Sequence, residues 1–215
     1  MRRLLGLLVP IAIFGALYLY DHGKIDLSSI LPGQEPAYKP IRVGGPVPKE
    51  IFGLRRVKNG VWKDSSGQVV YRQARVYAGG SKPQPLKPVR EDGCKYDKDK
   101  VVNVVVDSDE YPASALHLYL GARAGVPQVL HINRNPGYDI RSNSLEGIPS
   151  NSTTDRDETP FAISNEAVVY NRTEGTSDIA FIPYGDNRGS GSSMGGQLSD
   201  YCTGQAFRIV LDPPQ

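Results

Sequence analysis

The sequence predicts an α+β domain, with a small antiparallel sheet and short helices, preceded by an N-terminal hydrophobic helix and a Pro/Gly-rich linker. Three observations predict this class. They are an apolar run near the N-terminus, a stretch dense in Pro and Gly behind it, and short β-branched runs that alternate with helical segments after residue 100. Single domains cluster at roughly 100 to 150 residues, so a chain of 215 residues has room for one domain and an appendage. The expected division is 1–23, 24–95 and 96–215.

The first segment is typical of export. Arg2 and Arg3 precede the uncharged, mostly apolar run 4–20, which Asp21 ends. This length lies at the short end of the ~17 to 25 residues that span a bilayer as a helix. The arginines would stay in the cytoplasm and place the rest outside. No clear A-x-A-like cleavage site follows, so an uncleaved signal-anchor is favoured while a cleaved signal peptide stays open. We expect a secreted or membrane-anchored protein with its main domain outside the cytoplasm.

The middle of the chain is basic and poor in regular structure. Residues 1–100 hold 18 Lys and Arg against 9 Asp and Glu, whereas residues 101–215 hold 7 Arg against 14 Asp and Glu. Pro and Gly are dense from residue 21 to 50 and again from 79 to 88, which favours extended linkers. Between them, Val57–Tyr77 alternates apolar and polar residues around Asp64–Gly67, so we expect a small β-hairpin.

Cys94 and Cys202 fit an oxidising compartment, where they can form one disulfide. Closing a loop of that length would stabilise the fold by up to ~4 to 5 kcal/mol in the chain-entropy account. The alternative is that both thiols are unpaired. A zinc site is not expected, because it needs more ligands than these two cysteines offer.

The C-terminal part alternates strand and helix signals. The expected helices are 113–124, stopped by Gly125, and a short one at 193–201 that follows a Gly/Ser-rich loop. The expected strands are 101–106, 128–133, 167–170, 179–184 and 206–211, with an irregular stretch from 135 to 154. His117 and His131 fall on a helix and a strand, where a structural histidine is the expected reading.

Two polar segments carry the chemistry, Thr154–Pro160 and Gly185–Gly191. The first places three carboxylates within four residues, an arrangement that a cation or arginines must offset. The second combines Asp, Asn and Arg with a Gly/Ser-rich turn, whose backbone N–H groups could hold a phosphate. Each has an ordinary alternative, a solvated acidic turn for the first and simple turn chemistry for the second.

Taken together, the stretch from Tyr111 to the C-terminus resembles the secreted bacterial deoxyribonucleases of the NucA/NucB type. The resemblance rests on Asp155-Arg156-Asp157-Glu158 followed by Pro160, on Asp186-Asn187-Arg188-Gly189, on Tyr111-Pro112 with His117 behind it, and on Ser144–Pro149. It implies a ββα-metal type nuclease domain, in which a strand pair and a helix hold one divalent cation, Mg²⁺ or Mn²⁺, against the scissile phosphate. Thr159 departs from the tryptophan common at that position in the family, so packing beside the site is expected to differ.

The resemblance also assigns roles. Asp157 stands where related nucleases have a histidine general base. Asn187 matches the metal ligand on the helix, with Glu158 and Asp155 as further candidates for the metal shell. Arg156, Arg188 and Glu158 complete the expected catalytic set, and the phosphate is expected against Arg188, Gly189, Ser190 and Ser192.

The function implied is an extracytoplasmic endonuclease that hydrolyses DNA phosphodiester bonds with low sequence specificity. One alternative is a non-catalytic, membrane-anchored module that holds DNA or another polyanion through its basic arm. Another is a nuclease that prefers RNA, since no residue pattern here recognises a 2′-hydroxyl. DNA is the expected partner, with the membrane through residues 4–20 if these are uncleaved. An inhibitor protein would fit a nuclease, but no residue pattern supports one.

Overall fold

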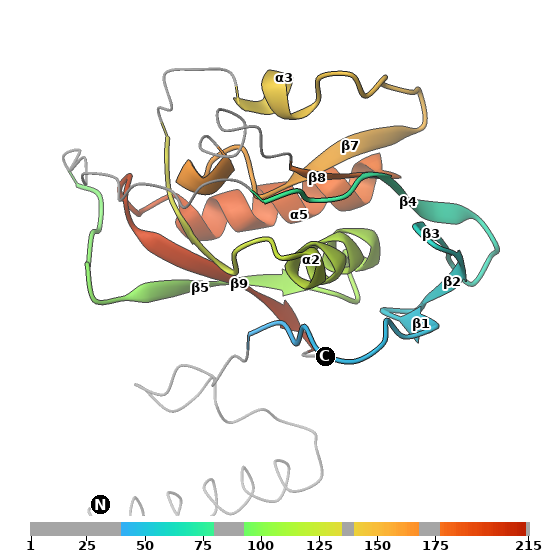
Figure 1. The fold of residues 1–215 in the computed structure, drawn as a ribbon. Coiled ribbons are helices and arrows are strands. Elements are labelled where there is room, and N and C mark those ends of the chain that lie inside the picture. Colours follow the sequence, from blue (N-terminus) through green and yellow to red (C-terminus); the bar gives the residue numbers. More distant parts are fainter. Residues whose placement is uncertain (1–39, 80–92, 135–139, 168–176, 214–215) are drawn as a thin grey trace, which may run out of the picture. The chain divides into compact units, whose positions relative to one another are not determined.

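The computed structural model describes residues 40–79, 93–134, 140–167 and 177–213, and Figure 1 shows their arrangement. The chain divides into two compact units, Met1–Tyr38 and Lys39–Gln215, and every described residue belongs to the second. The expected hydrophobic helix at 4–20 lies outside the described residues. In the described ranges, no helix combines the length and the apolar character that crossing a bilayer requires.

The larger sheet is antiparallel throughout, with the strand order β1-β2-β3-β4-β8-β7. Its strands are β1 (Glu50–Ile51), β2 (Leu54–Lys58), β3 (Val61–Lys63), β4 (Val69–Arg75), β7 (Thr154–Thr159) and β8 (Asp178–Pro183). The expected hairpin is present as β3 and β4. The second strand of this hairpin pairs with β8, so the sheet crosses the position expected as the domain boundary at residue 95. Long-range strand pairing of this kind leaves no local signal in the sequence.

Basic side chains lie on one face of strands β2, β3 and β4. Arg55 lies opposite Lys63 across β2 and β3, and Arg72 lies opposite Val61 across β3 and β4. Residues 61 and 63 share one face because side chains alternate along a strand. The other face is apolar, since Trp62 and its cross-strand partner Tyr71 are buried in the core.

The second sheet has three strands in the order β5-β9-β6. β5 (Val101–Asp107) runs parallel to β9 (Ala206–Asp212), and β6 (Val129–His131) runs antiparallel to it. The expected antiparallel pairing is present in both sheets, and the parallel pair of β5 and β9 stands beside it. The three strands expected at 101–106, 128–133 and 206–211 are confirmed in position. Alternate apolar residues of β5 and several of β9 are buried in the core.

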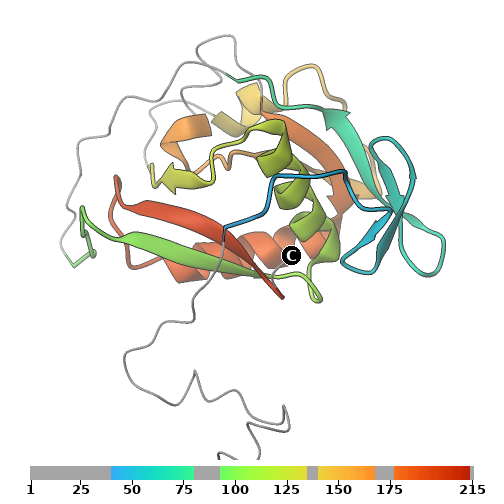
Figure 2. The same cartoon turned by 60° about the horizontal axis from the view of Figure 1, so that its bottom comes forward.

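Helices α2 (Pro112–Ala124) and α5 (Tyr184–Leu198) contact strands of both sheets and form a layer between them (Figures 1 and 2). α2 is the expected helix and ends at Gly125, which has the left-handed conformation that glycine favours. α3 (Ile140–Ser144) is a short helix within the stretch expected to be irregular. The strand expected at 167–170 is not seen where it can be checked, since Ala167 is helical and 168–170 lie outside the described residues.

α5 corrects the expectation of a loop followed by a short helix at 193–201. It begins at Tyr184 and takes up the whole Gly/Ser-rich segment, although glycine costs about 1 kcal/mol against alanine inside a helix. Close packing accounts for the glycine at 189. A Cβ on Gly189 would come within 2.5 Å of the Tyr111 ring. Close tertiary packing has overridden the weak helical propensity here.

A disulfide joins Cys94 to Cys202 and confirms the expected pairing. Beside it, Lys95 N–H donates to Asp200 O, and Cys202 N–H donates to Lys95 O. The bond therefore ties the segment before β5 to the segment before β9.

Candidate active site

The Asp-Arg-Asp-Glu motif lies on β7, the edge strand of the larger sheet. Alternate side chains of a strand face opposite sides. Asp155 and Asp157 face the helix layer, where they contact residues of α5 and α2. Arg156 and Glu158 face the other side, where Arg156 donates to Ile148 O and Arg141 of α3 pairs with Glu158. Three carboxylates that are neighbours in the sequence are thus divided between two environments.

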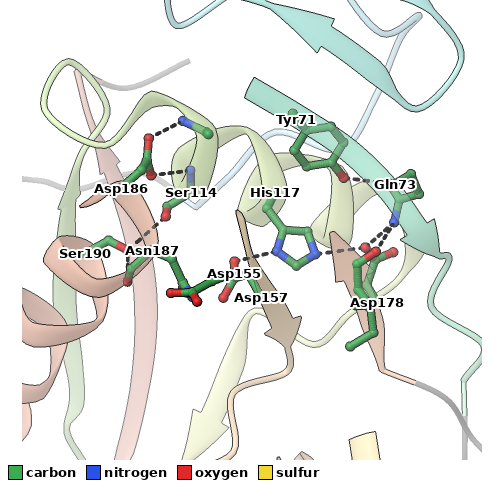
Figure 3. A network of polar contacts seen from close by, with 12 residues as sticks. Tyr71, Gln73, Ser114, His117, Asp155, Asp157, Asp178, Asp186, Asn187 and Ser190 are labelled. Atoms are coloured by element: carbon green, nitrogen blue, oxygen red, sulfur yellow. Dashed lines mark hydrogen bonds and ion pairs between the residues drawn. The ribbon is translucent and has the colours of Figure 1, made fainter. Parts of the chain in front are cut away.

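Asp157 is held by a buried histidine on α2. His117 is fully buried, with Nδ1 2.6 Å from Asp157 Oδ2 and Nε2 2.9 Å from Asp178 Oδ1 (Figure 3). Burial opposes charge on the ring, but the carboxylates of Asp157 and Asp178 outweigh it and raise the pKa of His117 to about 10. The ring is therefore an imidazolium at neutral pH, and both nitrogens donate.

The far end of this chain of contacts comes from β4. Gln73 Nε2 donates to Asp178 Oδ1 at 2.5 Å, and the Tyr71 hydroxyl lies 2.6 Å from Gln73 Oε1. Tyr77 N–H donates to Asp178 Oδ2 at 2.9 Å. Burial, together with Asp178 and Asp157, raises the pKa of Tyr71 well above its ordinary value, so its hydroxyl keeps its proton and serves as a donor.

Asp155 meets the second motif at the start of α5. Arg188 donates two hydrogen bonds to the Asp155 carboxylate, from Nε at 2.9 Å to Oδ2 and from Nη2 at 3.2 Å to Oδ1. Asn187 Nδ2 lies 3.3 Å from Asp155 Oδ2. Arg188 also stacks over the Tyr184 ring and remains 70% exposed, so its outer face is open to an anion. The structure thus brings the two motifs together, as the resemblance implies.

Glu158 is almost fully buried on the opposite face of β7, with Arg141 Nε 3.1 Å from Oε1. Burial raises the pKa of Glu158 to about 7, and Asp157 adds to the rise while Arg141 opposes it. Of the other two expected metal ligands, Asp155 lies on the opposite face of β7 from Glu158, and Asn187 of α5 contacts Asp155 there.

A cavity of about 560 Å³ opens beside the edge of β7. Because β7 is an edge strand, residues from both of its faces reach the cavity. Those with sequence-predicted roles are Asp155, Arg156, Asp157, Glu158, Asn187 and Arg188. The exposed fraction of the side chain is 15% for Asp157 and 22% for Asp155, so both carboxylates are accessible from the cavity but shielded from bulk water.

Three of the residues expected to contact the phosphate, Gly189, Ser190 and Ser192, lie within helix α5 and do not line the cavity. Gly189 packs against Tyr111, and Ser190 is buried with its hydroxyl donating to Ser114 Oγ at 2.9 Å. Ser192 is exposed and does not line the cavity. All of these residues lie beyond the first turn of α5, where each N–H is used by a carbonyl four residues earlier. Of the four expected phosphate contacts, Arg188 alone lines the cavity.

Asp186 has a role that the sequence did not predict. Its carboxylate accepts from Ala113 N–H at 2.9 Å and Ser114 N–H at 2.8 Å, the first free donors of α2 (Figure 3). Helix α2 has no side-chain cap of its own and carries Pro112 at its start. The first residue of the Asp-Asn-Arg-Gly motif thus caps the helix that carries His117.

The side-chain oxygens that line the cavity are of the kind that hard divalent cations bind. Asp155 Oδ and Asn187 Oδ1 are oxygen atoms on adjacent elements that could hold a cation, and Mg²⁺ needs only one or two protein oxygens when substrate phosphate and water fill the rest. Within the described residues, no group of three His, Cys, Asp or Glu side chains forms a cage for a metal.

His131, the other histidine considered from the sequence, lies away from this site. It bonds Glu166 through both its backbone N–H and its Nδ1, at 2.9 and 2.8 Å. Its side chain is 43% exposed, and its position fits the structural role expected for it.

Sequence reasoning missed Asp178, Gln73 and Tyr71. Asp178 begins β8 in a stretch of apolar residues, where a buried carboxylate is uncommon unless it is paired, and that signal could have marked it. Gln73 carries no such signal, because its partner Asp178 is 105 residues away. Tyr71 joins this set only through its hydrogen bond to Gln73.

Comparison with known proteins gives one informative match. No family model matches the sequence. Over 104 residues, 48% of this chain, the sequence is 38% identical to the DNA-entry nuclease of Bacillus subtilis (strain 168), and the match covers 67% of that protein. With the paired motifs brought together at one cavity, this level of identity shows that the chain belongs to the NucA/NucB-type nuclease family.

Proposed function

We propose that this protein is a metal-dependent endonuclease that hydrolyses DNA phosphodiester bonds with low sequence specificity, and that it acts outside the cytoplasm. The observation that carries the proposal is the Asp157 carboxylate, which lines the cavity and is held by His117 beside Asp155, Asn187 and Arg188. Membership of the nuclease family supports it, as does the relative that is named a DNA-entry nuclease.

Asp157 is the proposed general base. His117 occupies its Oδ2, so the other oxygen is the one that can accept a proton from an attacking water in the cavity. Arg188 lines the same cavity, and because its Nε and Nη2 bind Asp155, its Nη1 is the nitrogen that can pair with the phosphate. These two groups account for proton removal and for orientation of the phosphate.

Asp155 and Asn187 are the residues that would hold the divalent cation. When bound, Mg²⁺ or Mn²⁺ would stabilise negative charge on the phosphate and on the leaving oxygen. Arg188 neutralises Asp155 in the structure, which indicates that this carboxylate favours a cationic partner. Glu158 and Arg156 reach the cavity from the other face of β7, and we assign them no step.

The test is cleavage of supercoiled plasmid by the full chain with Mg²⁺ or Mn²⁺, and with EDTA. Asp157→Asn keeps the size of the side chain and a partner for His117 but removes the base, so cleavage should fall by at least ~100-fold. Asp109→Asn is the matched control, because Asp109 is exposed and does not line the cavity. Metal-independent cleavage, or full activity of Asp157→Asn, would refute the assignment. Binding of DNA without cleavage by the wild type would favour the non-catalytic module instead.

A further inference from the structure

The buried polar chain behind Asp157 begins on a strand outside the motifs of the family. Tyr71 and Gln73 lie on β4, whereas the motifs that carry the resemblance begin at Tyr111. In Figure 3 the side chains follow one another from Tyr71 through Gln73, Asp178 and His117 to Asp157, which lines the cavity.

The amide of Gln73 can take one orientation only. Its Nε2 faces two acceptors, Asp178 Oδ1 at 2.5 Å and Arg75 O at 2.7 Å, so nitrogen and oxygen cannot exchange places. The Tyr71 hydroxyl donates to Oε1 from a fully buried ring. Gln73 is therefore a fixed donor to Asp178.

Asp178 in turn fixes the imidazolium of His117. It is 1% exposed and accepts from Gln73 Nε2, Tyr77 N–H and His117 Nε2. Because both ring nitrogens of His117 are used, the ring cannot rotate without breaking a charge-assisted bond. The ring thus lies between two carboxylates, with Asp178 on one nitrogen and Asp157 on the other.

Packing alone does not account for this arrangement. Two carboxylates and an imidazolium in a buried position cost desolvation energy, and apolar side chains of similar volume often stabilise a core as well or better. The chain of contacts fixes the orientation of the Asp157 carboxylate, because His117 holds Oδ2 and leaves the other oxygen for the cavity.

We infer that Tyr71, Gln73 and Asp178 are positioning residues that act through His117 to fix the carboxylate of Asp157 for catalysis. The N-terminal strands are then part of the catalytic scaffold and not only an extension of the sheet. This inference rests on the proposed function, since it gives the buried chain a purpose only if Asp157 is the base.

The experiment compares Tyr71→Phe and Gln73→Leu with the wild-type full chain, using initial rates on a DNA duplex at saturating Mg²⁺. Tyr71→Phe removes a single hydroxyl. Tyr119→Phe is the matched control, because Tyr119 is also buried but lies outside the chain of contacts. Loss of positioning should lower kcat on the order of tenfold in Tyr71→Phe and more in Gln73→Leu, with KM for DNA unchanged. The control should keep its kcat.

A structural role would move different quantities. If Tyr71→Phe and Tyr119→Phe lower the melting temperature alike and both keep full kcat, and if Gln73→Leu keeps it too, the inference is wrong while the proposed function stands. If the wild type does not cleave DNA, the proposed function fails and the inference falls with it. Nitrogen chemical shifts of the His117 ring give a check independent of cleavage. They should show two protonated nitrogens in the wild type and a changed environment in Gln73→Leu.

Discussion

Replacement of Asp186 by alanine should destabilise the protein through the start of helix α2. Pro112 has no N–H, so the first free donors of this helix are the backbone N–H groups of Ala113 and Ser114, and both donate to Asp186. Asp186 thus acts as an N-cap although it lies more than 70 residues away in the sequence. Its negative charge also lies at the positive end of the helix dipole.

The expected loss follows from these contacts. Removal of an N-cap side chain costs ~0.5 to 2 kcal/mol, and an N–H left without a partner in a buried position costs ~1 to 3 kcal/mol. Asp186 is only partly buried, so water can replace part of what is lost. We therefore expect Asp186→Ala to lower the free energy of unfolding by about 2 kcal/mol. In a chain of this size that corresponds to a melting temperature lower by about 4 to 8 °C.

Thermal unfolding followed by circular dichroism measures this effect. Asp186→Asn keeps one acceptor and should lose about half as much. Asp99→Ala is the control, because Asp99 is exposed and its ion pair with Lys98 lies on the surface, where such pairs contribute roughly 0 to 1 kcal/mol. If Asp186→Ala melts within about 1 °C of the wild type, capping by Asp186 does not stabilise α2 and the reasoning is wrong.

Three further predictions concern the disulfide, the buried histidine and the basic face. Cys94→Ser with Cys202→Ser should lower the free energy of unfolding by up to ~4 to 5 kcal/mol, measured by urea denaturation under oxidising conditions. The pKa of His117 is raised from 6.5 to about 10, so its stabilising contribution is complete below pH 6.5 and is lost as the pH rises through 10. Urea denaturation at pH 6 and pH 9.5 should show this fall in the wild type and not in His117→Asn. Arg55→Gln and Arg72→Gln should each weaken DNA binding, because both arginines are exposed. Each should also reduce the slope of log K against log salt concentration by about one. Titration of DNA at several salt concentrations checks this.

The sequence predicted the elements whose signals are local. The β-branched run of β5 and the helix α2, stopped by Gly125, lie where their patterns place them. The pairing of Cys94 with Cys202 followed from their number and the expected compartment. Helix α5 could not be predicted, because its glycines have low helix propensity, and only the contact of Gly189 with the Tyr111 ring gives one of them a packing reason.

The candidate site was predicted by its motifs but not by its geometry. Asp155, Asn187 and Arg188 come together as the resemblance implies, because β7 and α5 are adjacent in the fold. The Gly/Ser-rich segment was expected to be a turn with free N–H groups, but it is part of helix α5. The role of Gln73 could not be predicted, because it depends on the pairing of β4 with β8, a contact that no local pattern encodes.

The edge position of β7 explains why one short motif supplies two kinds of group. A central strand has a neighbour on each side that keeps its two faces apart, but an edge strand has one open side, so residues from both faces can line one cavity. Alternation then gives Asp157 to the helix layer, where His117 holds one of its oxygens, and gives Glu158 to the opposite face, where burial raises its pKa to about 7. Two neighbouring carboxylates thereby acquire different properties without a difference in chemistry. The spacing Asp-x-Asp is thus the part of the motif that the proposed mechanism requires, because only residues two apart share the face that meets both α2 and α5.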